Sequence, residues 1–359
     1  MAKTISTKYM GGDYQSNRAD NTTITTTDFG YDLGATAVYK MTPFYNVRHR
    51  RGTDISSQME ERPFNPVDSR LWTWGFMPTR RSDGKLYVLP APTGAGQAPA
   101  RQAALNGGLP YGVGALTITA TESVAGLSRF GINAQNTFSA TGDLSISVAD
   151  VTGGLHGVSV TNNGRGALSV TSTGVVSGQG GMGIQANNGA NARDDLTITA
   201  VDATGGYSGI SAVNQGTGAL SVTSTGSVTG AAGSGLTANN SGTNLTIAVA
   251  DVTGDRMGIE AINQGTGALT VTSTGPVTAA TDRGIFAINY GDATGDLTIL
   301  SNAVSGGTDG ISAVNNGTGG LSVTSTGNVT GASGRGVYAF NWTNSTGGLS
   351  VSTAGVSGG

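Results

Sequence analysis

The chain has no cysteine among its 359 residues, little charge and no long apolar run. Without cysteine no disulfide can form, so the sequence does not indicate whether the protein resides in a reducing or an oxidising compartment. No stretch approaches the roughly 18 apolar residues that a membrane-spanning helix needs, and residues 1–17 lack the run of about 7–15 apolar residues typical of an export signal. Charged residues make up 11% of the chain, with a formal net charge of −3, unlike the strongly basic composition of nucleic-acid-binding domains.

The scarce charge is unevenly distributed along the chain. Positions 1–110 hold 13 of the 19 lysines and arginines against 9 acids, whereas the remainder has 6 arginines, no lysine and 13 acids. Eight of the nine prolines and two of the three tryptophans also precede position 111. We therefore divide the chain into a small irregular or β-rich anchoring domain at 1–93, a Gly/Pro/Ala-rich linker at 94–112, and a repetitive body at 113–359 that ends within a repeat.

The body repeats two short landmarks at a nearly constant spacing. One begins with a leucine, and the other, Gly-(Ile/Val/Leu)-x-x-x-Asn, ends on an asparagine; the asparagine spacing is constant except for a shorter interval between Asn240 and Asn263. Each landmark recurs about every 26 residues, a period typical of a stacked repeat array. The leucines are Leu116, Leu144, Leu168, Leu196, Leu220, Leu245, Leu269, Leu297, Leu321 and Leu349; the asparagines are Asn136, Asn162, Asn188, Asn214, Asn240, Asn263, Asn289, Asn315 and Asn341.

Each repeat has the pattern of short strands joined by glycine turns. In 167–178, Leu168 and Val170 alternate with hydroxyl residues, Gly174 interrupts the run, and Val176 begins a second extended piece. Period-two alternation indicates strands with one apolar face, which a single repeat is too small to bury. Stacked coils with parallel strands would bury it, so the fold class we expect is all-β, a right-handed parallel β-helix of about ten coils. The recurrent asparagines would then form a structural ladder of side-chain amides along the axis.

The repeats resemble a known family. The segments LSVTSTGxVTG and GISAVNxGTG look like the repeats of autotransporter passenger domains, which are right-handed parallel β-helices on the surface of Gram-negative bacteria. The resemblance covers residues 113–359 and implies the β-helix fold, but that fold hosts adhesins, hydrolases, lyases and viral fibres alike. An export signal and a membrane barrel, which the family carries, are not evident in this sequence.

The segment 1–93 holds the candidate assembly interface. Aromatic residues and arginines are enriched at protein interfaces, and both gather here, although the tryptophans could equally form a small local core. We favour a solvated loop or a protein contact over a nucleic-acid site for the basic cluster, because Asp54 and two glutamates follow it. The candidate residues are Arg48, Arg50, Arg51, Arg70, Trp72, Trp74, Phe76, Arg80 and Arg81.

The body offers little for catalysis. Asp150, Asp202 and Asp251 recur at corresponding places in alternate coils, roughly 10 Å apart by strand spacing, but the repeat itself accounts for such periodic residues. The body has one histidine, His156, and no lysine, which leaves little for acid–base chemistry. Its glycine turns lack the aspartate of calcium-binding repeats. We expect no catalytic residue, no cofactor and no metal site.

We therefore expect a non-enzymatic structural or adhesive surface fibre. One setting is a virion, as a phage head-decoration or tail-fibre protein, with residues 1–93 bound to the particle or to other copies of the chain and the β-helix projecting towards a cell-surface receptor or glycan. The alternative is a passenger fragment of an autotransporter adhesin, displayed outside a Gram-negative cell. Minor alternatives are a polysaccharide-binding or polysaccharide-cleaving β-helix and an ice-binding β-helix with outward rows of serine and threonine.

Overall fold

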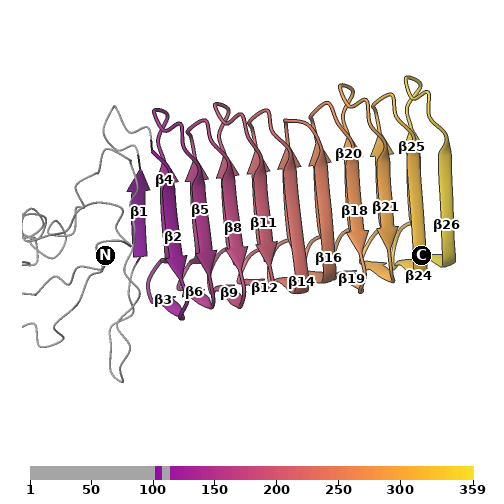
Figure 1. The fold of residues 1–359 in the computed structure, drawn as a ribbon. Helices are drawn as coiled ribbons and strands as arrows, with labels where there is room; N and C mark the ends of the chain where they lie inside the picture. Colours follow the sequence, from indigo (N-terminus) through magenta and orange to yellow (C-terminus); the bar gives the residue numbers. More distant parts are fainter. Residues whose placement is uncertain (1–101, 107–113) are drawn as a thin grey trace, which may run out of the picture.

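The computed structural model describes residues 102–106 and 114–359. Every regular element in these residues is a strand, and Figure 1 shows the strands of successive coils following one another along one axis, from β1 to β26. The chain forms an all-β parallel β-helix of about nine coils, close to the ten or so that the sequence predicts. Ten leucine-headed strands are present, but the last of them is not followed by a strand of the Gly-Ile type.

One coil contains three short strands with different burial patterns. β11 (Leu196–Ala200) and β12 (Asp202–Gly205) run along one wall and round a corner, and β13 (Ile210–Asn214) returns along the opposite wall. In β11 and β13 alternate side chains are buried, because successive residues of a strand point to opposite faces. The leucine, isoleucine and alanine side chains of each coil therefore enter one continuous core.

The strands assemble into two parallel sheets. The first sheet contains β1 (Gln102–Asn106), β4 (Phe130–Asn136), β7 (His156–Asn162), β10 (Ile184–Asn188), β13, β15 (Leu236–Asn240), β17 (Ile259–Asn263), β20 (Ile285–Asn289), β23 (Ile311–Asn315) and β25 (Val337–Asn341). The second contains the leucine-headed strands β2 (Leu116–Ala120), β5 (Leu144–Val148), β8 (Leu168–Ser172), β11, β14 (Leu220–Gly230), β16 (Leu245–Gly254), β18 (Leu269–Ser273), β21 (Leu297–Ser301), β24 (Leu321–Gly331) and β26 (Leu349–Gly358), and the short strands β3 (Val124–Gly126), β6 (Val151–Gly153), β9 (Val175–Gly178), β12, β19 (Val277–Ala279) and β22 (Val304–Gly306).

Equivalent residues of successive coils pair in register. Leu196 lies opposite Leu168 on one side and Leu220 on the other, and all pairings along this wall are parallel. The side chains of Leu168, Leu196, Leu220, Leu245 and Leu269 are fully buried. The predicted column of inward leucines is thus confirmed, and with it the β-helix.

Strand β1 extends the first sheet towards the N-terminus. It pairs with β4 in parallel, with Asn106 opposite Asn136. The strand lies within residues 94–112, the segment for which the sequence predicts a linker. The anchoring domain at 1–93 lies outside the described residues.

Alternate coils differ at the corner between the two strands of the second sheet. In β14 the register against β16 shifts between Ser224 and Ser227, as at a β-bulge. The buried hydroxyl of Ser224 donates to the carbonyl of Val201 in the preceding coil over 2.8 Å. The extra residue of the Thr-Ser-Thr-Gly coils is thus held by a bond along the axis.

The corner before each Gly-Ile strand permits no side chain. A Cβ atom on Gly183 would lie 2.7 Å from the carbonyl oxygen of Gly209, and one on Gly209 would lie 2.8 Å from that of Gly235. Real Cβ contacts are essentially never so short. The recurrent glycine therefore follows from the close stacking of coils at this corner.

Candidate functional site

The recurrent asparagines lie in one column at the corner that ends each strand of the first sheet. Eight of them, from Asn136 to Asn315, are at most 1% exposed. From Asn162 to Asn263 each Nδ2 donates to the Oδ1 of the next asparagine, over 2.8 to 3.3 Å, and Asn289 accepts the last of these bonds. The side-chain amides thus form a hydrogen-bonded ladder across six coils.

Each amide also fixes its own corner. Nδ2 of Asn214 donates to the carbonyl of Gly218 over 2.8 Å, and its Oδ1 accepts from the N–H of Gly216 over 3.2 Å. The ladder has fewer hydrogen bonds at its ends, where the Oδ1 atoms of Asn136 and Asn341 have no hydrogen-bond partner within the described residues. With its donors and acceptors occupied by the protein itself, the central ladder has no free group for a ligand.

The periodic aspartates of the body bond to the neighbouring coil. Oδ1 of Asp150 accepts the N–H of Val175 over 2.8 Å, and Oδ1 of Asp202 accepts the N–H of Ser227 over 2.6 Å. At the third site the corresponding residue is Pro276, which has no N–H to offer Asp251.

A second row of side-chain oxygens also accepts backbone N–H groups of the neighbouring coil, just before the leucine-headed strands. Oδ1 of Asp195 accepts the N–H of Ala219 over 2.7 Å, and Oδ1 of Asp296 accepts that of Gly320 over 2.7 Å. Asp143 and Asn244 make the equivalent bonds in other repeat pairs. These side chains therefore act as bridges between coils. No group of three histidine, aspartate or glutamate side chains in the described ranges is arranged to hold a metal ion.

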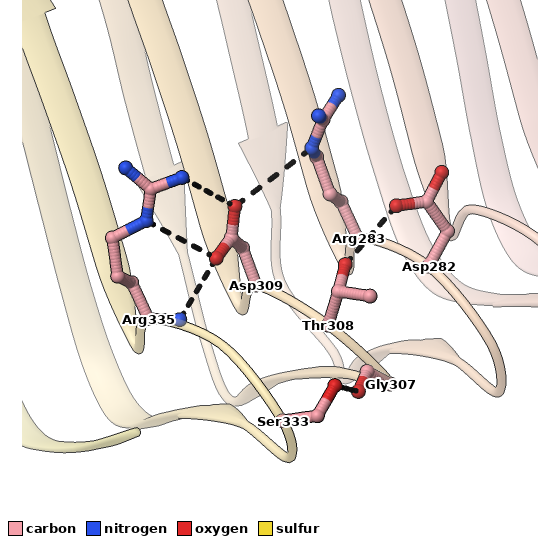
Figure 2. Close-up of polar contacts among 7 residues, drawn as sticks. All are labelled: Asp282, Arg283, Gly307, Thr308, Asp309, Ser333 and Arg335. Atoms are coloured by element: carbon pink, nitrogen blue, oxygen red, sulfur yellow. Dashed lines mark hydrogen bonds and ion pairs between the residues drawn. The ribbon is translucent and has the colours of Figure 1, made fainter. Parts of the chain in front are cut away.

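Three charged residues form an ion-pair chain along the axis near the C-terminal end, shown in Figure 2. Asp309 is 6% exposed; its Oδ2 lies 3.2 Å from Nη2 of Arg335 and 3.8 Å from Nε of Arg283. Its Oδ1 accepts both the backbone N–H and the Nε–H of Arg335. Burial alone would raise the pKa of Asp309, but these hydrogen bonds and the two arginine charges hold it below the ordinary value.

His156 occupies the corresponding position near the N-terminal end. Its ring stacks on Phe130 at 5.5 Å, and its Nδ1 accepts the N–H of Met182 over 2.9 Å. Burial, followed by the charge of Arg129, lowers the pKa of His156. The hydrogen bond requires a neutral imidazole with an unprotonated Nδ1, so the histidine is a stacking residue between coils.

The outer face of the leucine-headed strands carries rows of serine and threonine. Neighbouring hydroxyls interact along the axis, as between Ser145 and Ser169 at 2.6 Å. Ala248 pairs with Thr223 and Thr272, and Leu300 interrupts the same row while 44% exposed. The hydroxyl array is therefore not continuous.

Sequence reasoning missed an aromatic surface on the last coils. Five of the eight aromatic residues in 114–359 lie on or beside strands β20 and β25. The guanidinium of Arg335 lies 4.1 Å from the ring centroid of Tyr338. Along β25 the ring centroids of Tyr338 and Phe340 are 6.2 Å apart, and those of Phe340 and Trp342 are 5.6 Å apart. The available signal was an aromatic residue directly after a ladder asparagine. The surface consists of Phe286, Tyr290, Tyr338, Phe340 and Trp342.

The predicted assembly interface, which comprises Arg48, Arg50, Arg51, Arg70, Trp72, Trp74, Phe76, Arg80 and Arg81, lies outside the described residues. Within the described part, no helix is both long and apolar enough to span a bilayer. No protein-family model, curated protein or solved structure matches the chain. The resemblance to autotransporter passengers therefore rests on the repeats alone.

Proposed function

We propose that this chain is a non-enzymatic structural or adhesive protein of a biological surface, with the β-helix as its projecting rod. The observation that carries this proposal is the use of the polar side chains. Asparagine amides and aspartate carboxylates bond from coil to coil, so they stiffen the rod along its axis. A β-helix so constructed suits a spacer or fibre.

The finer proposal places the rod on a virion, as a head-decoration or tail-fibre protein. The abrupt change of composition at position 111 supports it, because a basic, Trp-bearing segment precedes an almost neutral repeat body. Residues 1–93 would bind the particle or further copies of the chain. The second candidate is an autotransporter adhesin on a Gram-negative cell, and it is favoured by the repeats themselves.

Antibody labelling of the native source separates these settings. Antibodies against the rod should decorate purified particles for a virion protein and intact cells for an autotransporter. If they label neither, and react only after lysis, the surface role is wrong.

The proposed lack of catalysis has its own test. The purified full chain is incubated with a panel of bacterial polysaccharides, pectin and host glycans, and new reducing ends are measured. We expect none. Turnover that disappears in Asp202→Asn or Asp251→Asn would establish a polysaccharide-cleaving enzyme instead.

A further inference from the structure

The corner directly after the asparagine ladder carries a row of alternating amides and aromatic rings over the last four coils. The row consists of Gln264, Tyr290, Asn316 and Trp342, one residue from each successive coil. Each backbone N–H donates to the carbonyl of the ladder asparagine in the preceding coil, over 2.7 to 2.9 Å. The four residues therefore occupy equivalent positions along the axis.

The two rings are held by matching loops. In the loop after Tyr290, the carbonyl of Tyr290 accepts the N–H of Ala293; in the loop after Trp342, that of Trp342 accepts the N–H of Ser345. Thr294 and Thr346 then tie the two loops to the coil before through backbone and hydroxyl bonds. The rings are thus preorganised two coils apart, about 10 Å by strand spacing.

Both rings are accessible. Tyr290 is 43% exposed and Trp342 is 52% exposed. Phe340 meets Trp342 edge to face, with ring centroids 5.6 Å apart and planes at 89°, and so supports the indole from one side. Asn316 lies between the rings along the axis and is partly exposed, and its Oδ1 is buried without a hydrogen-bond partner within the described residues.

We propose that this row binds an extended, uncharged glycan laid along the axis of the rod. A pyranose presents an apolar C–H face that packs on an aromatic ring, and hydroxyl edges that need amide donors and acceptors. The alternation of ring and amide supplies both in turn. A separation of two coils is close to the rise of two sugars in an extended β-linked chain, so the first and third sugars of such a chain would stack on the two rings. The row contains no charged side chain, which favours a neutral ligand over nucleic acid or an acidic polymer.

A protein partner fits this row less well. The core of a protein interface is more apolar than its rim, whereas in this row an amide side chain lies between the two rings. The inference deepens the proposed adhesive role, on which it rests, by naming the class of receptor. Its test uses purified chain, so its failure is distinguishable from failure of the surface labelling described above.

The test is binding of cellohexaose, chitohexaose and xylohexaose to the full chain by isothermal titration calorimetry. We expect at least one hexasaccharide to bind and the matching disaccharide, which cannot reach both rings, to bind more weakly. Tyr290→Ala and Trp342→Ala should each raise Kd about tenfold or more, which corresponds to about 1.4 kcal/mol. Trp342→Phe, which keeps a ring, should retain most of the affinity.

Tyr207→Ala is the matched control, because Tyr207 is 44% exposed but lies outside the row. It should leave Kd unchanged, and equal thermal midpoints would show that the variants fold. The proposal is overturned if no hexasaccharide binds the full chain, or if Tyr290→Ala and Trp342→Ala both leave Kd unchanged. It is equally overturned if those variants abolish self-association in sedimentation without changing glycan binding, since the row would then join copies of the chain.

Discussion

Nδ2 of Asn214 donates to Oδ1 of Asn240 over 2.8 Å, at a corner where both residues are fully buried. The same Nδ2 also donates to the carbonyl of Gly218. Two coils and one turn are thus joined through a single amide, which explains why aspartate, lacking the donor, could not replace asparagine here.

Asn214→Ala should destabilise the middle of the rod. Each buried partner left without a hydrogen bond costs about 1–3 kcal/mol, and in a stacked array the loss falls first on neighbouring coils. Hydrogen exchange should therefore quicken in β13 and β15 before the terminal coils. Asn341→Ala is the control, because Asn341 makes only long bonds of 3.4 Å to Gly347 and Gly348. Equal effects of the two changes would contradict a stabilising ladder.

Leu220→Ala should lower the free energy of unfolding by about 2–5 kcal/mol, the cost of a cavity left by a buried leucine. Leu300→Ala removes the same atoms from a side chain that is 44% exposed and should change stability by less than about 1 kcal/mol. Guanidinium unfolding followed by circular dichroism measures both. A similar loss for the two variants would mean that the leucine column is not the main core.

The fold could be predicted because a period of about 26 residues leaves few alternatives to stacked coils. The leucines, the alternating faces and the parallel pairing all follow from it. The number of coils, about nine, is close to the ten leucine landmarks of the sequence. Strand β1 was not foreseen, because residues 102–106 carry neither landmark of the repeat.

The side-chain chemistry between coils could be predicted less well. Arg283, Asp309 and Arg335 follow one another at the same interval as most of the ladder asparagines, so the ion-pair chain had a sequence signal that was overlooked. The alternation of Tyr290 and Trp342 with amides was overlooked for the same reason. Which backbone N–H each aspartate accepts depends on the geometry of the loops, and the spacing of residues in the sequence does not predict that geometry.

His156 should make stability depend on pH in mildly acidic solution. Its folded pKa is lowered from the ordinary 6.5, so the unfolded chain takes up the proton first and acid favours unfolding. The contribution is complete above about pH 6.5 and is lost as pH falls towards the folded pKa. The thermal midpoint of the full chain should fall across this range, and less in His156→Gln. Identical pH profiles would contradict the neutral, hydrogen-bonded imidazole.

Asp309 should add a second loss at lower pH. Its folded pKa lies below the ordinary 3.8, so its stabilising effect is present above that value and disappears as pH falls through the folded pKa. Asp309→Asn should lower the thermal midpoint near neutrality and flatten the profile in strong acid. High salt should reduce the difference only partly, because Asp309 is buried and screening acts mainly on exposed charges. A variant as stable as the parent at neutral pH would show that the ion-pair chain does not stabilise the rod.

Asp202 and Asp251 offer a matched pair for the bridging role of the carboxylates. Oδ1 of Asp202 accepts two bonds from Ser227, from the N–H at 2.6 Å and the hydroxyl at 3.2 Å, whereas Asp251 faces Pro276, which lacks an N–H. Asp202→Ala should therefore cost about 0.5–1.5 kcal/mol, and Asp251→Ala less than about 0.5 kcal/mol. Pro276→Ser in the parent should then stabilise the rod, because it restores a donor opposite Asp251. Guanidinium midpoints of the three variants measure these differences, and an equal cost at both aspartates would assign their effect to charge alone.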